Sequence, residues 1–136
     1  MLVTSCSGTA QVSPPEPATN TDPCADLMNS LPVSLVDQSM RETDPPSPLT
    51  AAWGDPPITI RCGVPDPDAL TPAAQLYSVS GVDWFPEELT QGYVFTTYGR
   101  TTNVEVTVPD DYEPEISAVT ELSALVAETI PRSPKR

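Results

Sequence analysis

Carboxylates and two isolated arginines are the side chains of this sequence that could do chemistry. The chain has no histidine, which excludes the commonest general base and every Ser-His-Asp or Cys-His arrangement. The acids nearest in sequence to the two tryptophans, Trp53 and Trp84, are Asp55, Asp83, Glu87 and Glu88. Two carboxylates beside rings that stack on sugars are typical of a glycosidase, so a carboxylate-dependent hydrolase of cell-wall glycan is one hypothesis. The simpler interpretation is that Asp55 forms a turn, the tryptophans are core residues, and Glu87-Glu88 begin a solvated helix.

Arg61 and Arg100 each lie in or beside a predicted strand of an otherwise acidic chain. A guanidinium can bind a carboxylate or phosphate through two parallel hydrogen bonds, so we expect any anionic ligand to meet Arg61 or Arg100. The alternative is that each arginine pairs with an acid on its own surface. The stretches VPDPDAL and VPDDYEPE offer too few oxygen donors, without loop spacing, for calcium. No catalytic residue, metal ligand or cofactor is predicted.

The charge balance limits the classes of partner. The chain carries 19 acidic and 6 basic residues, a formal net charge of −13. Such a surface repels phosphate backbones and anionic headgroups, which argues against direct nucleic-acid binding. No apolar stretch is long enough to span a bilayer.

The opening residues LVTSC resemble a bacterial lipobox. Val3, Thr4 and Ser5 supply an aliphatic residue and two small ones ahead of Cys6, the position that would receive diacylglycerol. We therefore expect residues 1–6 to be the remnant of a signal peptide, with a basic and an apolar region encoded upstream. The alternative is an ordinary exposed cysteine. Lipidation of Cys6 would anchor the protein to the outer face of the cell membrane; without it the protein would be secreted.

Residues 7–22 are rich in serine, threonine and proline, a composition typical of an extended linker that holds a domain away from the membrane. In an exported chain the remaining pair, Cys24 and Cys62, is expected to form a disulfide that stabilises the fold by roughly 4 kcal/mol. The alternative, a reactive thiol, would need a cationic neighbour such as Arg61 or Arg41.

The elements that must position these residues follow from apolar spacing. A first helix is expected over 22–31, with Asp22 as its N-cap and Pro23 in its first turn. Its apolar face consists of Cys24, Leu27, Met28 and Leu31. Short strands are expected over 35–40, 58–62, 76–79 and 82–85, and a helical turn or two within 66–76.

The clearest strand pattern is the alternating pair of runs around Gly99-Arg100, which predicts a β-hairpin with Val104, Val106 and Val108 facing inward. A last helix has an apolar stripe made of Ile116, Val119, Leu122, Val126 and Ile130. The predicted fold class is α+β: a small antiparallel sheet of four to five strands, with the N-terminal and C-terminal helices packed on one face. This single domain would span 23–131, followed by a basic tail over 132–136.

Three blocks in order, AAWGDPPITIRCGVPDP, VSGVDWF and FTTYGRTTNVEVTVPDDYEP, resemble a family of exported actinobacterial proteins known only as a domain of unknown function. The resemblance covers about residues 22–131 and includes the Cys24 that precedes SLP. It implies compartment and lineage, and no reaction. We therefore expect a membrane-tethered or secreted, non-catalytic module of the cell envelope, whose partner is an unidentified envelope protein or anionic ligand.

Overall fold

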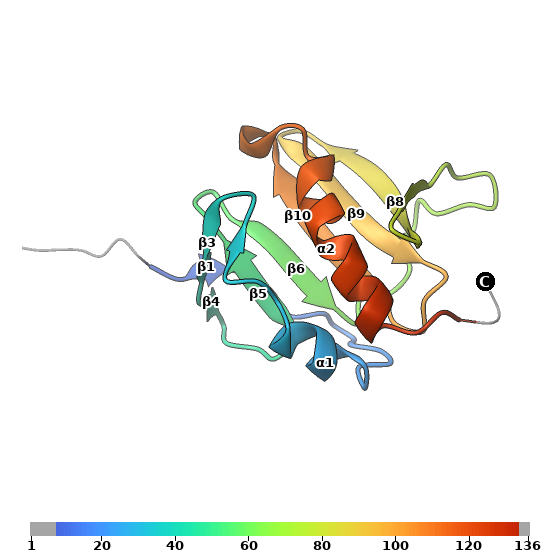
Figure 1. Cartoon of the computed structure of the whole chain (residues 1–136), viewed down its shortest axis with the longest axis horizontal. Coiled ribbons are helices and arrows are strands. Elements are labelled where there is room, and N and C mark those ends of the chain that lie inside the picture. The colour runs from blue at the N-terminus through green and yellow to red at the C-terminus, as the bar shows by residue number, and fades with distance from the viewer. Residues whose placement is uncertain (1–7, 134–136) are drawn as a thin grey trace, which may run out of the picture.

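The computed structural model describes residues 8–133, so Cys6 and its expected lipidation lie outside the described residues. The strands are β1 (Ala10–Gln11), β2 (Ser34–Leu35), β3 (Gln38–Arg41), β4 (Thr43–Asp44), β5 (Thr50–Trp53), β6 (Ile58–Cys62), β7 (Tyr77–Val79), β8 (Val82–Leu89), β9 (Gly92–Tyr98) and β10 (Val104–Pro109). The helices are α1 (Cys24–Asn29), the 3₁₀ turn η1 (Asp110–Tyr112) and α2 (Ile116–Thr129). Figure 1 shows α2 lying across the strands and α1 below them.

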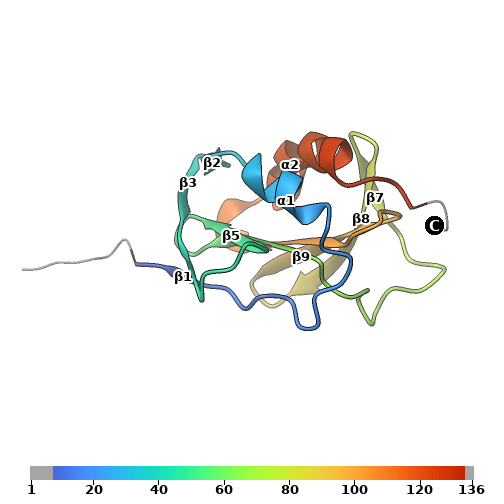
Figure 2. The same cartoon turned by 90° about the horizontal axis from the view of Figure 1, so that it is seen from below.

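The fold is α+β, as predicted, but its sheet is larger than the expected four to five strands. Eight strands pair in the order β2-β3-β5-β6-β10-β9-β8-β7, and every pair in that order is antiparallel. A separate two-stranded parallel sheet joins β1 to β4. Seen from below, both helices lie on the same side of the sheet (Figure 2).

The additional strands come from segments that the apolar pattern does not mark. Residues 35–40, expected to be one strand, fold instead as the hairpin β2–β3. The chain reverses at Val36 and Asp37, whose φ angles of 49° and 62° match the positive-φ pair of a type I′ turn. The alanine-rich β5 pairs with β6 through all four of its residues. Alanine has weak strand propensity, so burial between neighbouring strands decides the conformation of β5.

The core lies between the sheet and the helices. Val104, Val106 and Val108 are fully buried, as the alternation predicted. The stripe of α2 covers them, and Val119, Leu122, Val126 and Ile130 have no exposed surface. The last helix and the Gly99-Arg100 hairpin are therefore confirmed.

Two expected helical segments are absent from the described part of the chain. Glu87 and Glu88 continue strand β8 instead of starting a helix. The segment 66–76 forms turns only. The first helix is shorter than expected, with Pro23 at its N-cap position and no side-chain cap.

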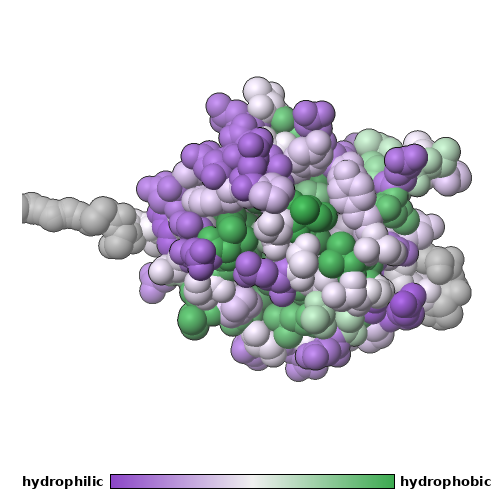
Figure 3. All heavy atoms as spheres, turned by 45° about the horizontal axis from the view of Figure 1, so that its top comes forward, coloured by the Kyte–Doolittle hydropathy of each residue, from purple (hydrophilic) through white to green (hydrophobic). Residues whose placement is uncertain are grey.

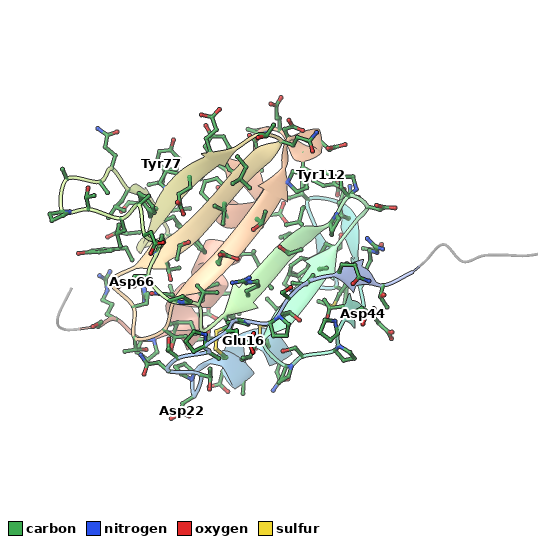
Figure 4. All side chains as sticks on the ribbon, turned by 180° about the vertical axis from the view of Figure 1, so that it is seen from behind. Glu16, Asp22, Asp44, Asp66, Tyr77 and Tyr112 are labelled. Carbon is green, nitrogen blue, oxygen red and sulfur yellow. A yellow bond between two sulfur atoms is a disulfide. The ribbon has the colours of Figure 1, made fainter. Side chains whose placement is uncertain are left out.

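Residues 8–22 lie against the domain, which differs from the free linker expected from their composition. The Ala10 N–H donates to the Glu42 carbonyl at 2.8 Å, within the β1–β4 pair. Ala10 and Val12 are buried in a small cluster with Ala52. From the back, the segment runs from the β1–β4 pair past Glu16 along one end of the sheet (Figure 4). The proline-rich 8–22 segment is therefore docked by the small apolar cluster of Ala10, Val12 and Ala52 and by the pairing of β1 with β4.

As predicted, Cys24 and Cys62 form a disulfide, with their Cα atoms 5.9 Å apart. Both residues are buried in the main core. The bridge fastens α1 to the end of β6, so it ties the helical layer to the centre of the sheet.

Candidate functional site

Arg61 lies on the sheet face opposite the helices. Its Nε is 3.1 Å from the Glu105 carboxylate, on the residue paired with it across β6 and β10. The two side chains are only about a quarter exposed, at 27% and 23%. Burial raises the pKa of Glu105, with Glu87 acting in the same direction and the Arg61 charge opposing both. The Arg61 charge therefore offsets part of the rise that burial causes in the pKa of Glu105.

The surface beside this pair is a shallow hollow of about 330 Å³. Four acids and one arginine line it: Asp66, Asp68, Glu87, Glu105 and Arg61. An anionic ligand entering here would meet more negative than positive charge. The surroundings of Arg61 therefore favour its alternative interpretation, an ion pair within the domain.

Arg100 is only 7% exposed and lies in the connection between β9 and β10. Its Nη1 donates to the Ile130 carbonyl at 2.9 Å, and its Nη2 donates to the Gly81 carbonyl at 2.8 Å. Burial, and secondarily the positive charge of Arg132, lower the pKa of the Arg100 guanidinium from its ordinary value. Arg100 thus joins the end of α2 to the β7–β8 turn.

The residues after α2 are fastened to the same connection. The Ser133 N–H donates to the Gly99 carbonyl and the Thr101 N–H to the Pro131 carbonyl, both at 2.9 Å. Arg132 and Ser133, predicted to begin a basic tail, are therefore paired with the domain. A polar hollow of about 340 Å³ beside Arg100 shares Pro65 and Asp66 with the hollow of Arg61, so the two predicted ligand-binding arginines lie in neighbouring sites.

The tryptophans cannot stack on a sugar, because Trp53 and Trp84 have no exposed surface. Their indole N–H groups donate to the Pro32 carbonyl and to Ser123 Oγ, each at 2.9 Å. This corrects the stacking role considered from the sequence. Burial of both rings agrees with the simpler interpretation, in which they are core residues.

The acids near the tryptophans are also spread across the sheet. Asp55 follows β5 and Asp83 lies in β8, and the strands β6, β10 and β9 separate them. At about 4.8 Å per strand, the spacing across the strands alone is roughly 15–20 Å, against about 5–9.5 Å for a glycosidase pair. The register also offsets the two acids along the strands. Glu87 and Glu88 are adjacent strand residues and point to opposite faces. The structure does not bring these carboxylates together.

Among residues 8–133, no group of three or more Asp, Glu or Cys side chains could hold a metal ion. No helix in that range is long and apolar enough to cross a membrane.

A hollow of about 770 Å³ lies between α1 and the segment 40–51. We call it the α1 groove, and its apolar lining consists of Ala25, Met28, Leu31, Met40, Pro46, Pro48 and Ala51. Met40 is 39% exposed, and its N–H donates to the carbonyl of Val33, which is 80% exposed. An apolar lining beside exposed apolar side chains is typical of a surface that docks another molecule.

Sequence reasoning missed the α1 groove. It assigned Met28 and Leu31 to the buried face of a helix, yet both are only partly buried. Met40 was placed in a strand with no indication of its exposure. Pro46 and Pro48 line the groove, but a proline pair alone does not predict one. Figure 3 shows that hydrophobic residues reach the surface of one face in separate patches among hydrophilic ones.

Comparison with known families and proteins gives one match. The family model described as protein of unknown function (DUF3515) matches residues 4–135. No curated protein and no solved structure matches the chain.

Proposed function

We propose that this chain, which belongs to the DUF3515 family of proteins of unknown function, is a non-catalytic binding module of the cell envelope. The observation that carries the proposal is the α1 groove, because its apolar lining continues onto exposed Val33 and Met40. Methionines suit such a surface, since their flexible thioethers adapt to the shape of a partner. The partner we propose is an apolar segment of another envelope protein.

The proposed location outside the cytoplasm is supported by the lipobox-like residues ending at Cys6 and by the buried disulfide. Because residues 8–22 are docked on the domain, a lipid anchor at Cys6 would also fix how far the domain lies from the membrane. Arg41 donates from Nη2 to the Gly8 carbonyl at 2.7 Å and from Nη1 to the Gly54 carbonyl at 2.8 Å. Cys6 is two residues before Gly8, so a lipid on it would hold the domain within about 7 Å of chain length of the bilayer.

Site-specific photo-crosslinking in the native host tests the groove. A photoreactive residue at Met40 should give one discrete adduct with an envelope protein, and Met28→Glu in the same chain should abolish it. The matched control is Leu89, 45% exposed in β8 and outside the groove lining. Equal labelling from Leu89, or an adduct that survives Met28→Glu, would contradict docking in the α1 groove.

Fractionation tests the anchor independently. Cys6→Ser should move the full-length precursor from the membrane to the soluble fraction, while leaving the Met40 adduct intact in extracts. Retention of Cys6→Ser in the membrane would reject Cys6 as the anchoring residue.

A further inference from the structure

Another hollow lies at the other end of the sheet from the α1 groove, where the start of α2 meets β7 and β9. We call it the aromatic pocket; its volume is about 350 Å³ and its lining is Tyr77, Tyr93, Phe95, Pro114, Glu115 and Ile116. None of these residues lines the α1 groove. Figure 4 places Tyr77 on the β7–β8 side of the sheet, away from the end that carries β1 and β4.

The pocket consists of a buried ring between two more exposed ones. Phe95 is 2% exposed and forms the floor. The Tyr93 ring stacks on Phe95 with centroids 5.7 Å apart, and the Tyr77 ring is tilted against it at 6.5 Å. Tyr77 is 46% exposed, so part of its ring is open to a ligand.

Negative charge surrounds these rings. Glu115 lines the pocket, and Glu88 lies directly across from Tyr93 in the β8–β9 register, so both side chains are on the same face. The field of Glu88, followed by burial, Tyr77 and Glu115, raises the pKa of the Tyr93 phenol.

No arginine of residues 8–133 compensates this charge. Arg41 donates to backbone carbonyls of residues 8, 9 and 54, and Arg61 pairs with Glu105. Arg100 and Arg132 donate to backbone carbonyls around Gly81 and the end of α2. The aromatic pocket therefore combines aromatic rings with carboxylates, and a positively charged ligand would neutralise those carboxylates.

We propose that the aromatic pocket binds the alkylammonium side chain of a lysine in a basic segment of a partner protein. Aromatic rings attract a cation through their quadrupole, and the flanking carboxylates of Glu88 and Glu115 add Coulomb attraction. The apolar stem of lysine fits against Phe95 and Ile116 while its ammonium reaches the rim. A choline headgroup carries the same cationic chemistry, but its phosphate would face the two glutamates.

The proposal goes beyond the α1 groove and does not depend on it. A protein with a net charge of −13 attracts basic partners over long range. This long-range attraction of a basic partner and the binding of its lysine in the aromatic pocket favour the same ligand.

Titration monitored by NMR of the tyrosine rings tests the proposal on the Cys6→Ser chain. N-acetyl-lysine methylamide should shift the Tyr77 and Tyr93 ring signals saturably. The neutral isostere N-acetyl-norleucine methylamide should bind at least about fivefold more weakly, as expected for the loss of about 1 kcal/mol of cation–aromatic attraction. Equal affinity for the two probes would overturn the proposal, as would preferential binding of glycerophosphocholine.

Two variants locate the site. Tyr77→Leu keeps apolar area and removes the ring, and should weaken lysine binding about fivefold. Glu88→Gln should weaken it two- to fivefold, whereas Glu128→Gln, an exposed change at the far end of α2, should leave it unchanged. Equal effects of Glu88→Gln and Glu128→Gln would show general charge attraction only and overturn the assignment. Self-association abolished by Lys135→Gln with Arg136→Gln would assign the pocket to the tail of a second copy instead.

Discussion

The two faces of the sheet have opposite chemistry. The face under the helices carries tryptophan, isoleucine and valine, including Trp53, Ile60 and Val106, all without exposed surface. The other face presents threonines and the Arg61–Glu105 pair, and the docked 8–22 segment covers part of it. Figure 2 shows the helices on one side of the sheet and β1 on the other.

The difference explains why two arginines of the same acidic domain have different roles. On the helical side Arg100 is buried and donates to neutral backbone carbonyls, so it fixes the geometry of the chain. On the polar side Arg61 is partly exposed and pairs with the partly buried Glu105 carboxylate. An arginine in a strongly acidic protein therefore need not have an external anion, and its burial decides how much stability it supplies.

The largest effect should come from the bridge on the helical face. Replacing Cys24 and Cys62 together by alanine removes the disulfide between α1 and β6 and should cost about 4 kcal/mol. The melting temperature should fall by roughly 10–20 °C, as calorimetry would show. The matched control is the wild-type protein under reducing conditions, which should melt close to the double variant. A fall of only a degree or two would mean that core packing alone holds α1.

Arg100→Met should have the next largest effect. The change leaves the buried Ile130 carbonyl without its charged donor and removes the shorter of the two arginine bonds to the Gly81 carbonyl, so we expect a loss of about 2–3 kcal/mol in denaturant unfolding. Arg132→Met is the control, because Arg132 is exposed and its 3.2 Å bond reaches the same Gly81 carbonyl. Its cost should stay below about 1 kcal/mol. Similar costs for the two variants would contradict the distinction between buried and exposed arginine.

The sequence was informative where burial repeats with a period. Alternating valines predicted β10, and the apolar stripe predicted α2, since each element buries one face against the same core. It was uninformative where tertiary contacts override composition. The hairpin β2–β3 reverses at Val36, a β-branched residue that sequence patterns place within a strand, and the Glu121 carboxylate accepts the Val36 N–H at 3.1 Å.

The candidate sites were predicted less well than the fold, for a physical reason. Residue type marked Arg61 and Arg100, but it could not show that each meets an internal partner. The α1 groove and the aromatic pocket consist of ordinary apolar residues, and only their exposure distinguishes them from core. Exposure is set by the packing of distant segments and has no short-range signature.

On the polar face, Arg61→Met should change the titration of Glu105 more than it changes the free energy of unfolding. Burial raises the pKa of Glu105 and the Arg61 charge lowers it, so removing Arg61 should raise that pKa further. Between the pKa of Glu105 in the unfolded chain and its raised pKa in the native protein, the native carboxyl is protonated and the unfolded carboxyl is not. The free energy of unfolding of Arg61→Met should therefore decline as pH rises through this range. The unfolding free energy at neutral pH should change by less than about 1 kcal/mol. An NMR titration of Glu105 that is unchanged in Arg61→Met would contradict the coupling.

The smallest global effect is expected for Arg41, which holds the docked 8–22 segment against the polar face near β5. Its guanidinium donates to the Gly8, Thr9 and Gly54 carbonyls, while the β1–β4 pair and the Ala10–Val12–Ala52 cluster provide the remaining contacts. Arg41→Lys keeps the charge but not the planar fork that reaches several carbonyls at once.

We expect amide exchange at Ala10 and Val12 in Arg41→Lys to accelerate about tenfold, corresponding to local opening by about 1.4 kcal/mol. The global melting temperature should change little, because local opening of this segment leaves the helical core intact. Arg132→Met again serves as the control and should leave exchange at both amides unchanged. Unaltered protection in Arg41→Lys would mean that the Ala10–Val12–Ala52 cluster alone docks the segment. The contrast between helices fixed firmly on one face of the sheet and a segment fixed weakly on the other would then be smaller.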